Sequence, residues 1–353
     1  MRRGADIALA AAASLAALVP VRTAEAPHEL LRRLLTQQGG FDDGEVARVL
    51  RGEVVVGDLR SPVTRQIGLA GAVRIDAPAA RTVDLVRDIE QLERGKGFLA
   101  TRKLSEPPTL ADFASFDLPA QDVRALRDCR PDDCDVKLGL PALRQLQDVD
   151  WDAPDATAEA RWLVRRMVLA HVLRYRKGGN GALAVYRDQE RPTSIAEEFD
   201  AMLTDTANLT SAFPVASRYL RSYPHGRPAA TDDFFYWSLA EFGLKPVFRL
   251  NHVVIHRTEA RPGLLYVLTT KQLYASHYFH SALELRALVD DDEQPGRRHY
   301  LVVLNLARSD GLTGLFGPIV RGRVRSGARN SLRTALTIMR TRAQGGAVPS
   351  AGR

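Results

Sequence analysis

The sequence lacks the motifs that identify many enzyme classes. It contains no HExxH, no GxSxG and no glycine-rich phosphate loop. Residues 178–181 (Gly-Gly-Asn-Gly) have no lysine after them, and the end of a helix explains this run. Zinc peptidases, α/β-hydrolases and P-loop nucleotide hydrolases therefore find no support, and we predict no catalytic residue, metal site or cofactor.

Cysteine is also scarce. The chain has 2 cysteines, Cys129 and Cys134, on either side of an Arg-Pro-Asp-Asp segment. In an exported protein this spacing favours a local disulfide. Two reduced thiols, or half of a metal site, are the alternatives, although no further Cys or His lies close in sequence.

Long apolar runs are absent beyond the N-terminus. Residues 1–26 begin with Met-Arg-Arg, continue with an apolar run from Ile7 to Val21 and end in Ala-Glu-Ala26. This is the pattern of a secretory signal peptide, and the run is shorter than the roughly 20 residues of a membrane span. An uncleaved anchor is the alternative. We expect export, with cleavage near Ala26 and a periplasmic or secreted mature chain.

Acidic residues are almost missing from one basic segment. The formal net charge is +7, yet residues 297–342 contain 10 arginines and a single acid, Asp310. Such a segment can meet an anionic membrane surface or an acidic ligand, and a solvated helix face is the alternative. The export signal and the absence of a nucleic-acid-binding motif count against nucleic acid as a partner.

The last third of the chain has the clearest pattern. Four segments rich in β-branched and aromatic residues follow one another, separated by turn-forming residues, and Pro318 then opens a long basic helix. This order predicts an α+β fold in which a curved antiparallel sheet is wrapped on a long C-terminal helix. The expected strands are 247–257, 264–277, 281–290 and 299–308. The helix is expected to face the sheet with Val320, Val324, Ala328, Leu332, Ala335 and Met339.

Earlier segments are assigned in the same way. We expect one domain over residues 27–345, with a helical insertion at about 141–220 and a disordered tail at 346–353. Strands are predicted at 54–56, 66–76 and 98–104, and helices at 79–92, 183–186 and 233–242.

Strand periodicity selects the candidate site residues. Every second residue from Leu265 to Val289 is mostly apolar, and Lys271 and His277 interrupt this series. A buried lysine can bind an anionic group or act as a nucleophile, and a histidine can act as acid or base. A lysine paired with a carboxylate, and a core histidine with its hydrogen bonds satisfied, are the structural alternatives. The predicted ligand-binding residues are Lys271, His277, Tyr274, His252, Asn305 and Trp237.

A family resemblance adds to this interpretation. The strand that ends in Val73-Arg-Ile-Asp-Ala-Pro78 and the helix directly after it resemble the opening of START-like helix-grip proteins, the polyketide cyclase and lipid-transport (SRPBCC) superfamily. The final strands, the connector at residues 310–317 with its glycines and Phe316, and the last helix resemble their ending. The resemblance covers residues 65–100 and 247–342, is topological, and carries over no catalytic residue. It implies a cavity for a lipid or other hydrophobic small molecule between sheet and helix.

We therefore expect an exported protein that binds a lipid or similar molecule in an apolar cavity between the sheet and the C-terminal helix. A cyclase or hydrolase acting on an apolar substrate in the same cavity is one alternative. A structural or interaction protein of the cell envelope is the other.

Overall fold

The computed structural model describes residues 27–346, except 60, 62, 96, 242–244, 260 and 310–316. The predicted signal peptide and the predicted tail from residue 347 onward lie outside the described residues. Among the described residues, no helix is both long and apolar enough to cross a bilayer.

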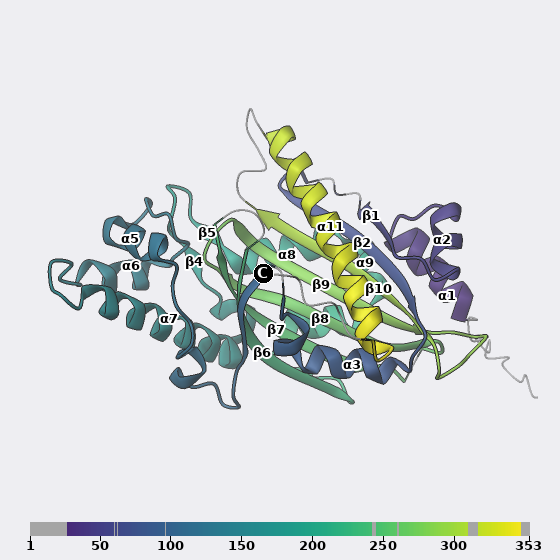
Figure 1. The fold of residues 1–353 in the computed structure, drawn as a ribbon. Coiled ribbons are helices and arrows are strands. Elements are labelled where there is room, and N and C mark those ends of the chain that lie inside the picture. Colours follow the sequence, from purple (N-terminus) through teal and green to yellow (C-terminus); the bar gives the residue numbers. More distant parts are fainter. Residues whose placement is uncertain are drawn as a thin grey trace, which may run out of the picture.

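Eight antiparallel strands form one large sheet (Figure 1). Their order across the sheet is β1-β2-β10-β9-β8-β7-β6-β3, so the last strand lies beside β2 from the start of the chain. The strands are β1 (Val55–Leu59), β2 (Gln66–Ile75), β3 (Phe98–Lys103), β6 (Thr231–Ala240), β7 (Val247–Arg257), β8 (Leu264–Ala275), β9 (Phe279–Asp290) and β10 (His299–Ser309). A separate ladder joins β4 (Val185–Tyr186) and β5 (Thr193–Ser194).

One face of the sheet carries the C-terminal helix α11 (Gly317–Ala343) and α3 (Ala79–Arg87), and we name it the α11 face (Figure 1). Leu332 and Leu336 of α11 lie directly over Gly71 of β2, where an added Cβ would come within 2.7 Å of the Leu336 side chain. The missing side chain thus lets helix and sheet approach closely. The apolar core on this face includes Val73, Leu301, Val303, Leu332, Leu336 and Met339.

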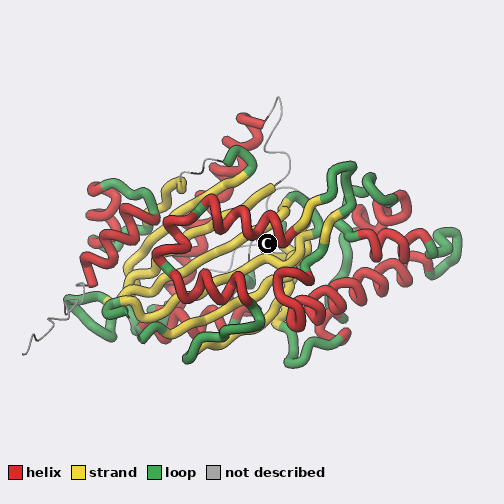
Figure 2. The backbone as a smooth tube through the Cα atoms, turned by 180° about the vertical axis from the view of Figure 1, so that it is seen from behind, coloured by secondary structure: helices red, strands yellow, loops and turns green. Residues whose placement is uncertain are grey.

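The opposite face is covered by the inserted helices and the N-terminal helices, and we name it the helical-block face. Figure 2 shows helices of this block in front of the sheet. Two apolar clusters fill the space beneath them. The helices are α1 (Pro27–Arg33), α2 (Asp43–Leu50), α5 (Ala120–Asp128), α6 (Leu140–Gln147), α7 (Ala156–Gly178), α8 (Ile195–Asp205), α9 (Ala207–Ala212) and α10 (Pro214–Ser222), with a π-helical turn at Leu34–Gln38 and 3-10 turns at Leu110–Phe113 and Gly179–Ala182.

The predicted fold class is confirmed: the protein is α+β, with a curved antiparallel sheet, a long C-terminal helix packed on it and inserted helices. The four predicted strands of the last third correspond to β7, β8, β9 and β10 within two residues at each end.

The predicted helix at 233–242 is wrong, because this segment forms β6. Its residues from Phe234 to Ala240 are all buried, since both faces of the strand are covered. A strand buried on both faces shows no alternation of polar and apolar residues, so its pattern is easily mistaken for a helix. The last residue of that predicted helix, Phe242, lies outside the described residues.

Three smaller assignments also change. The predicted helix at 183–186 is wrong, because β4 begins at Val185. The predicted helix at 79–92 is interrupted at Asp88, where α3 ends and α4 (Ile89–Leu92) begins. On α11 the predicted apolar stripe is correct at Ala328, Leu332 and Met339, whereas Val324 and Ala335 are exposed and Leu336 is buried in place of Ala335. The side chain of Val320 lies outside the described residues.

Candidate functional site

Lys271 lies in the core on the helical-block face. Its side chain is 0% exposed, and its ammonium nitrogen donates to Asn180 Oδ1. The nitrogen also lies 3.9 Å from the ring centre of Phe199 and 5.0 Å from that of Tyr175. Burial holds the pKa of Lys271 well below its usual value, and no carboxylate among the described residues forms an ion pair with it.

His252 lies directly across the ladder from Lys271. Tyr175 Oη is 3.3 Å from its Nδ1, and an Asp233 carboxylate oxygen is 3.5 Å from its Nε2. Burial lowers the pKa of His252, and the nearby Asp233 carboxylate opposes that change. The imidazole is enclosed by aromatic rings, with Phe235 stacked on it at 4.6 Å. This is a packed polar contact inside a core.

Tyr274 and Trp237 have satisfied polar atoms. Tyr274 Oη donates to the carbonyl oxygen of Lys137 at 2.8 Å, and Trp237 Nε1 donates to that of Asp112 at 2.9 Å. Burial raises the pKa of the Tyr274 phenol well above its usual value. Both side chains belong to the apolar core on the helical-block face, and they link the backbone at Asp112 and Lys137 to the sheet.

His277, which follows β8, contacts two residues that precede the predicted insertion, Asp122 and Asp135. Its Nδ1 lies 3.0 Å from the carbonyl oxygen of Asp135, and its Nε2 lies 3.0 Å from Asp122 Oδ2. Both partners accept hydrogen bonds, so a ring protonated on both nitrogens satisfies the two contacts. The His277 and Asp122 side chains are only 4% and 3% exposed. The predicted disulfide between Cys129 and Cys134 is confirmed, and it closes a loop next to Asp135.

A bulge in β8 explains why these residues share a face. Leu250 of β7 pairs with Tyr274, whereas its neighbour Asn251 pairs with Gln272, so Leu273 is an extra residue. The strict alternation expected from Leu265 to Val289 therefore fails at Leu273. Of the six predicted ligand-binding residues, five lie on the helical-block face and only Asn305 lies on the α11 face. Their role in binding stays a prediction.

A charged cluster that the sequence did not reveal lies on the α11 face. We define the charged cluster as Glu93, Tyr236, Arg249, Glu284 and Arg286. Glu93 follows α4, and its carboxylate accepts hydrogen bonds from Tyr236 Oη at 3.0 Å and Thr101 Oγ1 at 2.9 Å. Arg249 Nη2 lies 3.6 Å from the same carboxylate, and Arg286 forms an ion pair with Glu284.

Burial shifts the pKa values of two groups in the charged cluster, Glu93 and Tyr236. Burial raises the pKa of Glu93, while the Arg249 charge and the two hydroxyl donors oppose that change. Burial and the neighbouring Glu93 charge raise the pKa of Tyr236 well above its usual value. Two carboxyl groups and two guanidinium groups make the cluster close to neutral in formal charge. Strongly perturbed groups of this kind often mark functional sites.

The sheet surface around the charged cluster is partly exposed to solvent. The side chains of Arg249, Glu284 and Arg286 are 21%, 25% and 14% exposed. Asn251 stands beside Tyr236 on the ladder, is 3% exposed, and its Nδ2 has no hydrogen-bond partner among the described residues. Neighbouring half-exposed floor positions on this face are Thr270, Ala282, Asn305 and Ala307.

Part of this cluster had a sequence signal. Glu284 and Arg286 alternate with leucines in β9, and strand periodicity places them opposite the face of Lys271. Tyr236 was not predicted to lie on this face, because its segment was wrongly assigned to a helix. Glu93 comes from a different segment, and no local pattern connects it with a strand more than 140 residues away.

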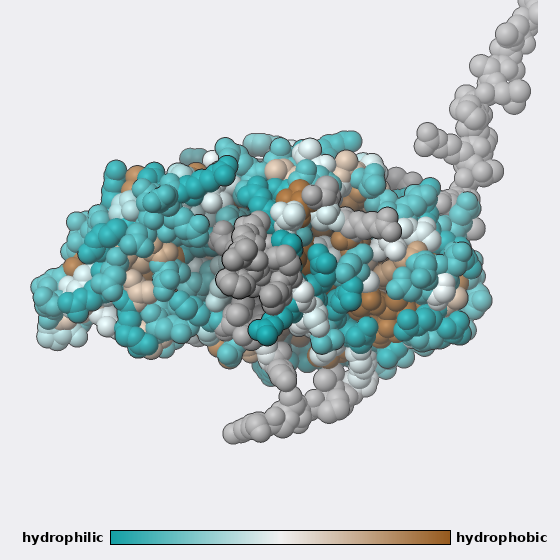
Figure 3. Space-filling model, turned by 90° about the horizontal axis from the view of Figure 1, so that it is seen from above, coloured by the Kyte–Doolittle hydropathy of each residue, from teal (hydrophilic) through white to brown (hydrophobic). Residues whose placement is uncertain are grey.

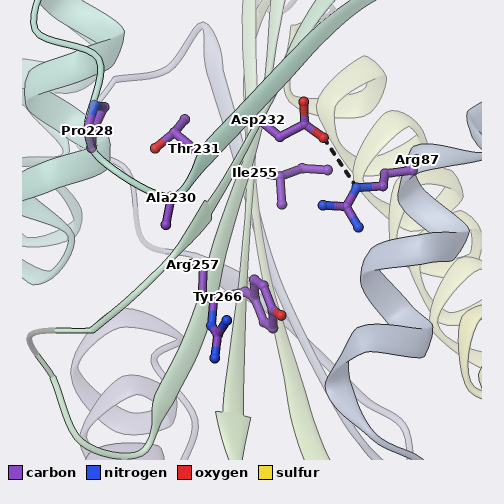
Figure 4. A pocket seen from close by; sticks show the side chains of 8 residues that line it. All are labelled: Arg87, Pro228, Ala230, Thr231, Asp232, Ile255, Arg257 and Tyr266. Atoms are coloured by element: carbon purple, nitrogen blue, oxygen red, sulfur yellow. Dashed lines mark hydrogen bonds and ion pairs between the residues drawn. The ribbon is translucent and has the colours of Figure 1, made fainter.

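A cleft of about 390 Å³ lies at the other end of the α11 face, beside α3 (Figure 4). Figure 4 shows Arg87 reaching from α3 toward Asp232, with Ile255 and Tyr266 on the neighbouring strands. It is lined by Arg87, Pro228, Ala230, Thr231, Asp232, Ile255, Arg257 and Tyr266. The lining therefore combines charged, polar and apolar side chains.

One group of potential metal ligands, His28, Asp291 and Asp292, lies within 4.8 Å. Its contacts have structural explanations. His28 Nε2 pairs with Asp292 at 2.7 Å, and Asp291 Oδ1 accepts the backbone N–H of Glu293 at 2.9 Å. We therefore assign this group to the capping of the β9–β10 turn.

The exposed surface is mostly hydrophilic in the view of Figure 3, with smaller hydrophobic patches. α11 contributes seven arginines and no acidic residue. Arg325 and Arg329 form ion pairs with Asp58, and Arg340 donates to the carbonyl oxygen of Gly52.

No protein-family model and no curated protein matches the sequence.

Proposed function

We propose that this protein binds a small amphipathic molecule on the α11 face, with the polar group of that molecule at the charged cluster. The observation that carries the proposal is the unpartnered amide of Asn251 beside this cluster. A buried donor without a partner costs roughly 1–3 kcal/mol, and a bound acceptor would remove that cost.

The charges of the site favour a particular kind of polar group. Arg249 and Glu93, and Arg286 and Glu284, form two ion pairs, so the cluster offers both donors and acceptors without an excess charge. A zwitterionic or neutral hydrogen-bonding group can exchange contacts with both pairs, whereas a bare anion would face two carboxylates. We therefore expect zwitterionic lipids to bind more tightly than fatty acids of similar length.

The apolar part of the molecule would lie against the rest of this face. Leu69 and Val303 are on neighbouring strands, and the small side chains of Ala282 and Ala307 face each other across the β9–β10 ladder. Burial of apolar surface would supply affinity at roughly 25 cal/mol per Å² before the costs of association. The START-like resemblance supports this placement, because in that superfamily the ligand lies between sheet and C-terminal helix.

Export is part of the proposal. The N-terminal pattern of a signal peptide supports it, and the disulfide between Cys129 and Cys134 is compatible with an oxidising compartment. The ligand would then be met outside the cytoplasm.

The direct test is to purify the full chain from a bacterial host without detergent, extract it with organic solvent and identify the extract by mass spectrometry. We expect an amphiphile in stoichiometric amount, and a zwitterionic lysophospholipid added to stripped protein should raise its melting temperature. A protein that carries no amphiphile and responds to none of a lipid panel would contradict the proposal.

Matched variants locate the binding. Asn251→Ala should release the amphiphile or weaken binding about tenfold, whereas Asn330→Ala, on the exposed side of α11, should leave binding unchanged. Circular dichroism would establish that both variants are folded. Equal retention of the amphiphile by the two variants would place the site elsewhere.

Acid–base catalysis on the same face is a second candidate function, favoured by Glu93. Its raised pKa and its contact with Tyr236 Oη resemble the tuning of a general acid. Turnover of a bound ester that is lost in Glu93→Gln while binding is retained would support it.

A further inference from the structure

We infer that the cleft beside α3 is a second ligand site, separate from the charged cluster, and that it takes a small organic anion with a carboxylate and an apolar or aromatic body. It does not depend on the proposed amphiphile site. The two differ in position along β6, because Asp232 in the cleft and Tyr236 in the charged cluster are four residues apart on one strand.

The cleft has the size and the mixed lining of a small-molecule site. Its volume of about 390 Å³ falls within the roughly 300–1,000 Å³ common for ligand pockets. Five parts of the chain contribute, namely α3, the segment before β6, β6, β7 and β8. Ile255 and Tyr266 supply an apolar wall, since both pack on the apolar core of the α11 face.

The charge of the cleft favours an anion. Arg87 is paired with Asp232 at 3.3 Å, which leaves Arg257 as the second guanidinium of the lining. Arg257 is exposed, and its side chain has no ion-pair partner among the described residues. Two guanidinium groups and one carboxylate give the lining a net positive charge. A guanidinium matches a carboxylate in shape and can hold it with two hydrogen bonds.

The backbone of the cleft is held in place by several hydrogen bonds. Ala230 has a φ of +51°, which is uncommon for a residue with a side chain. The backbone N–H of Arg257 donates to the carbonyl oxygen of Ala230 at 3.0 Å. The Arg227 side chain donates to the carbonyl oxygen of Thr231 at 2.8 Å. Strain that the surroundings maintain is typical of ligand sites. These hydrogen bonds hold the wall of the cleft that presents Arg257.

Benzoate and benzamide make a matched pair of probes, because they share a shape and differ in charge. The protein would be labelled with ¹³C at isoleucine δ1 methyl groups, and Ile255→Val would identify the signal that reports on the cleft. We expect benzoate to shift the Ile255 signal with saturable binding and benzamide to bind at least tenfold more weakly. No shift of this signal, or an equal response to both probes, would overturn the inference.

Three variants complete the test. Arg257→Gln should weaken benzoate binding about tenfold, whereas Arg333→Gln removes the same charge from exposed α11 and should have little effect. Asn251→Ala, which impairs the proposed amphiphile site, should leave benzoate binding intact. A loss of benzoate binding in Asn251→Ala but not in Arg257→Gln would instead place the anion at the charged cluster.

Discussion

The two faces of the sheet hold their polar side chains in different ways. On the helical-block face, Lys271 and His277 are 0% and 4% exposed, and each is hydrogen-bonded to another part of the chain. On the α11 face, Arg249 and Glu284 keep about a fifth to a quarter of their surface exposed. The first arrangement joins segments of the fold, whereas the second leaves charged groups within reach of a ligand.

This difference shows what an isolated polar residue in an apolar strand means. A fully enclosed polar group must be satisfied by the protein itself, so its most direct role is to specify the packing around it. A cluster that is shielded but still reached by solvent can exchange a water contact for a ligand contact. The comparison predicts that mutations on the helical-block face change stability, and that mutations on the α11 face change binding.

The largest expected effect is that of Asp122→Asn on the helical-block face. The substitution removes the charge partner of the buried His277, and loss of one member of a buried pair costs about 3–5 kcal/mol. We expect a loss of about 3 kcal/mol in the free energy of unfolding, measured by urea denaturation. The control is Asp135→Asn, whose exposed pair with Lys245 should contribute less than about 1 kcal/mol. Equal effects for the two variants would contradict the structural role of His277.

A second large effect concerns pH and His171 of α7. Burial lowers its pKa to about 4, and its Nε2 is 3.0 Å from the carbonyl oxygen of Leu273. The unfolded chain takes up a proton near pH 6.5 while the folded chain does not, so stability is lost as the pH falls from 6.5 to 4. The two pKa values correspond to about 3 kcal/mol.

His171→Gln keeps a donor for that carbonyl but cannot titrate. Denaturation curves between pH 4 and 7 should therefore show a shallower loss of stability in this variant, with exposed His225→Gln behaving like the parent protein. A slope unchanged by His171→Gln would show that other groups govern the acid response.

The sequence sufficed for the elements with strong local patterns. β7 to β10 combine β-branched residues with clear turn signals, and α11 has a proline near its start and a helical repeat. It failed at β6, whose aromatic residues are buried on both faces, and at the bulge in β8, which depends on pairing with Leu250 and leaves no local mark. Strand periodicity therefore placed Lys271 and Glu284 on opposite faces correctly, but it placed Tyr274 on the wrong face.

The charged cluster was harder to predict because its members are distant in sequence. Glu93 contacts Arg249 and Tyr236 near the edge of the sheet, where β3 pairs with β6. The cleft has the same origin, since Arg87 reaches Asp232 across a separation of 145 residues. Both sites arise from tertiary contacts, whereas the local disulfide between Cys129 and Cys134 was correctly predicted from spacing.

A smaller and opposite effect is expected for Glu93→Gln on the α11 face. Because the pKa of Glu93 is raised, the folded state loses stability as the pH rises from the usual carboxyl pKa through the raised value. The glutamine variant avoids this loss and can still accept from Tyr236 and Thr101.

Denaturation at pH 5 and pH 8 should show that Glu93→Gln gains stability relative to the parent at the higher pH, while amphiphile binding falls. This is the reverse of Asp122→Asn, although both substitutions exchange a carboxylate for an amide. A relative loss of stability at pH 8 would assign Glu93 to the structure and weaken the contrast between the faces.

The smallest effect on stability is expected on the exposed side of α11, for which contact with an anionic membrane surface stays a prediction from the sequence. Arg323 and Arg333 are exposed and have no ion-pair partner among the described residues. Val324, which follows Arg323, is 36% exposed. Each arginine near an anionic bilayer contributes about 1 kcal/mol, so Arg323→Gln with Arg333→Gln should weaken adsorption to phosphatidylglycerol-containing vesicles about tenfold or more. The free energy of unfolding should change by less than about 0.5 kcal/mol, because neither side chain is part of the packing.

Sedimentation with vesicles would measure adsorption to the membrane. The control is the double variant Arg144→Gln with Arg191→Gln, which removes the same charge from the helical block. Equal losses in the two double variants would mean that net charge alone drives adsorption, and α11 would then have no special role in it.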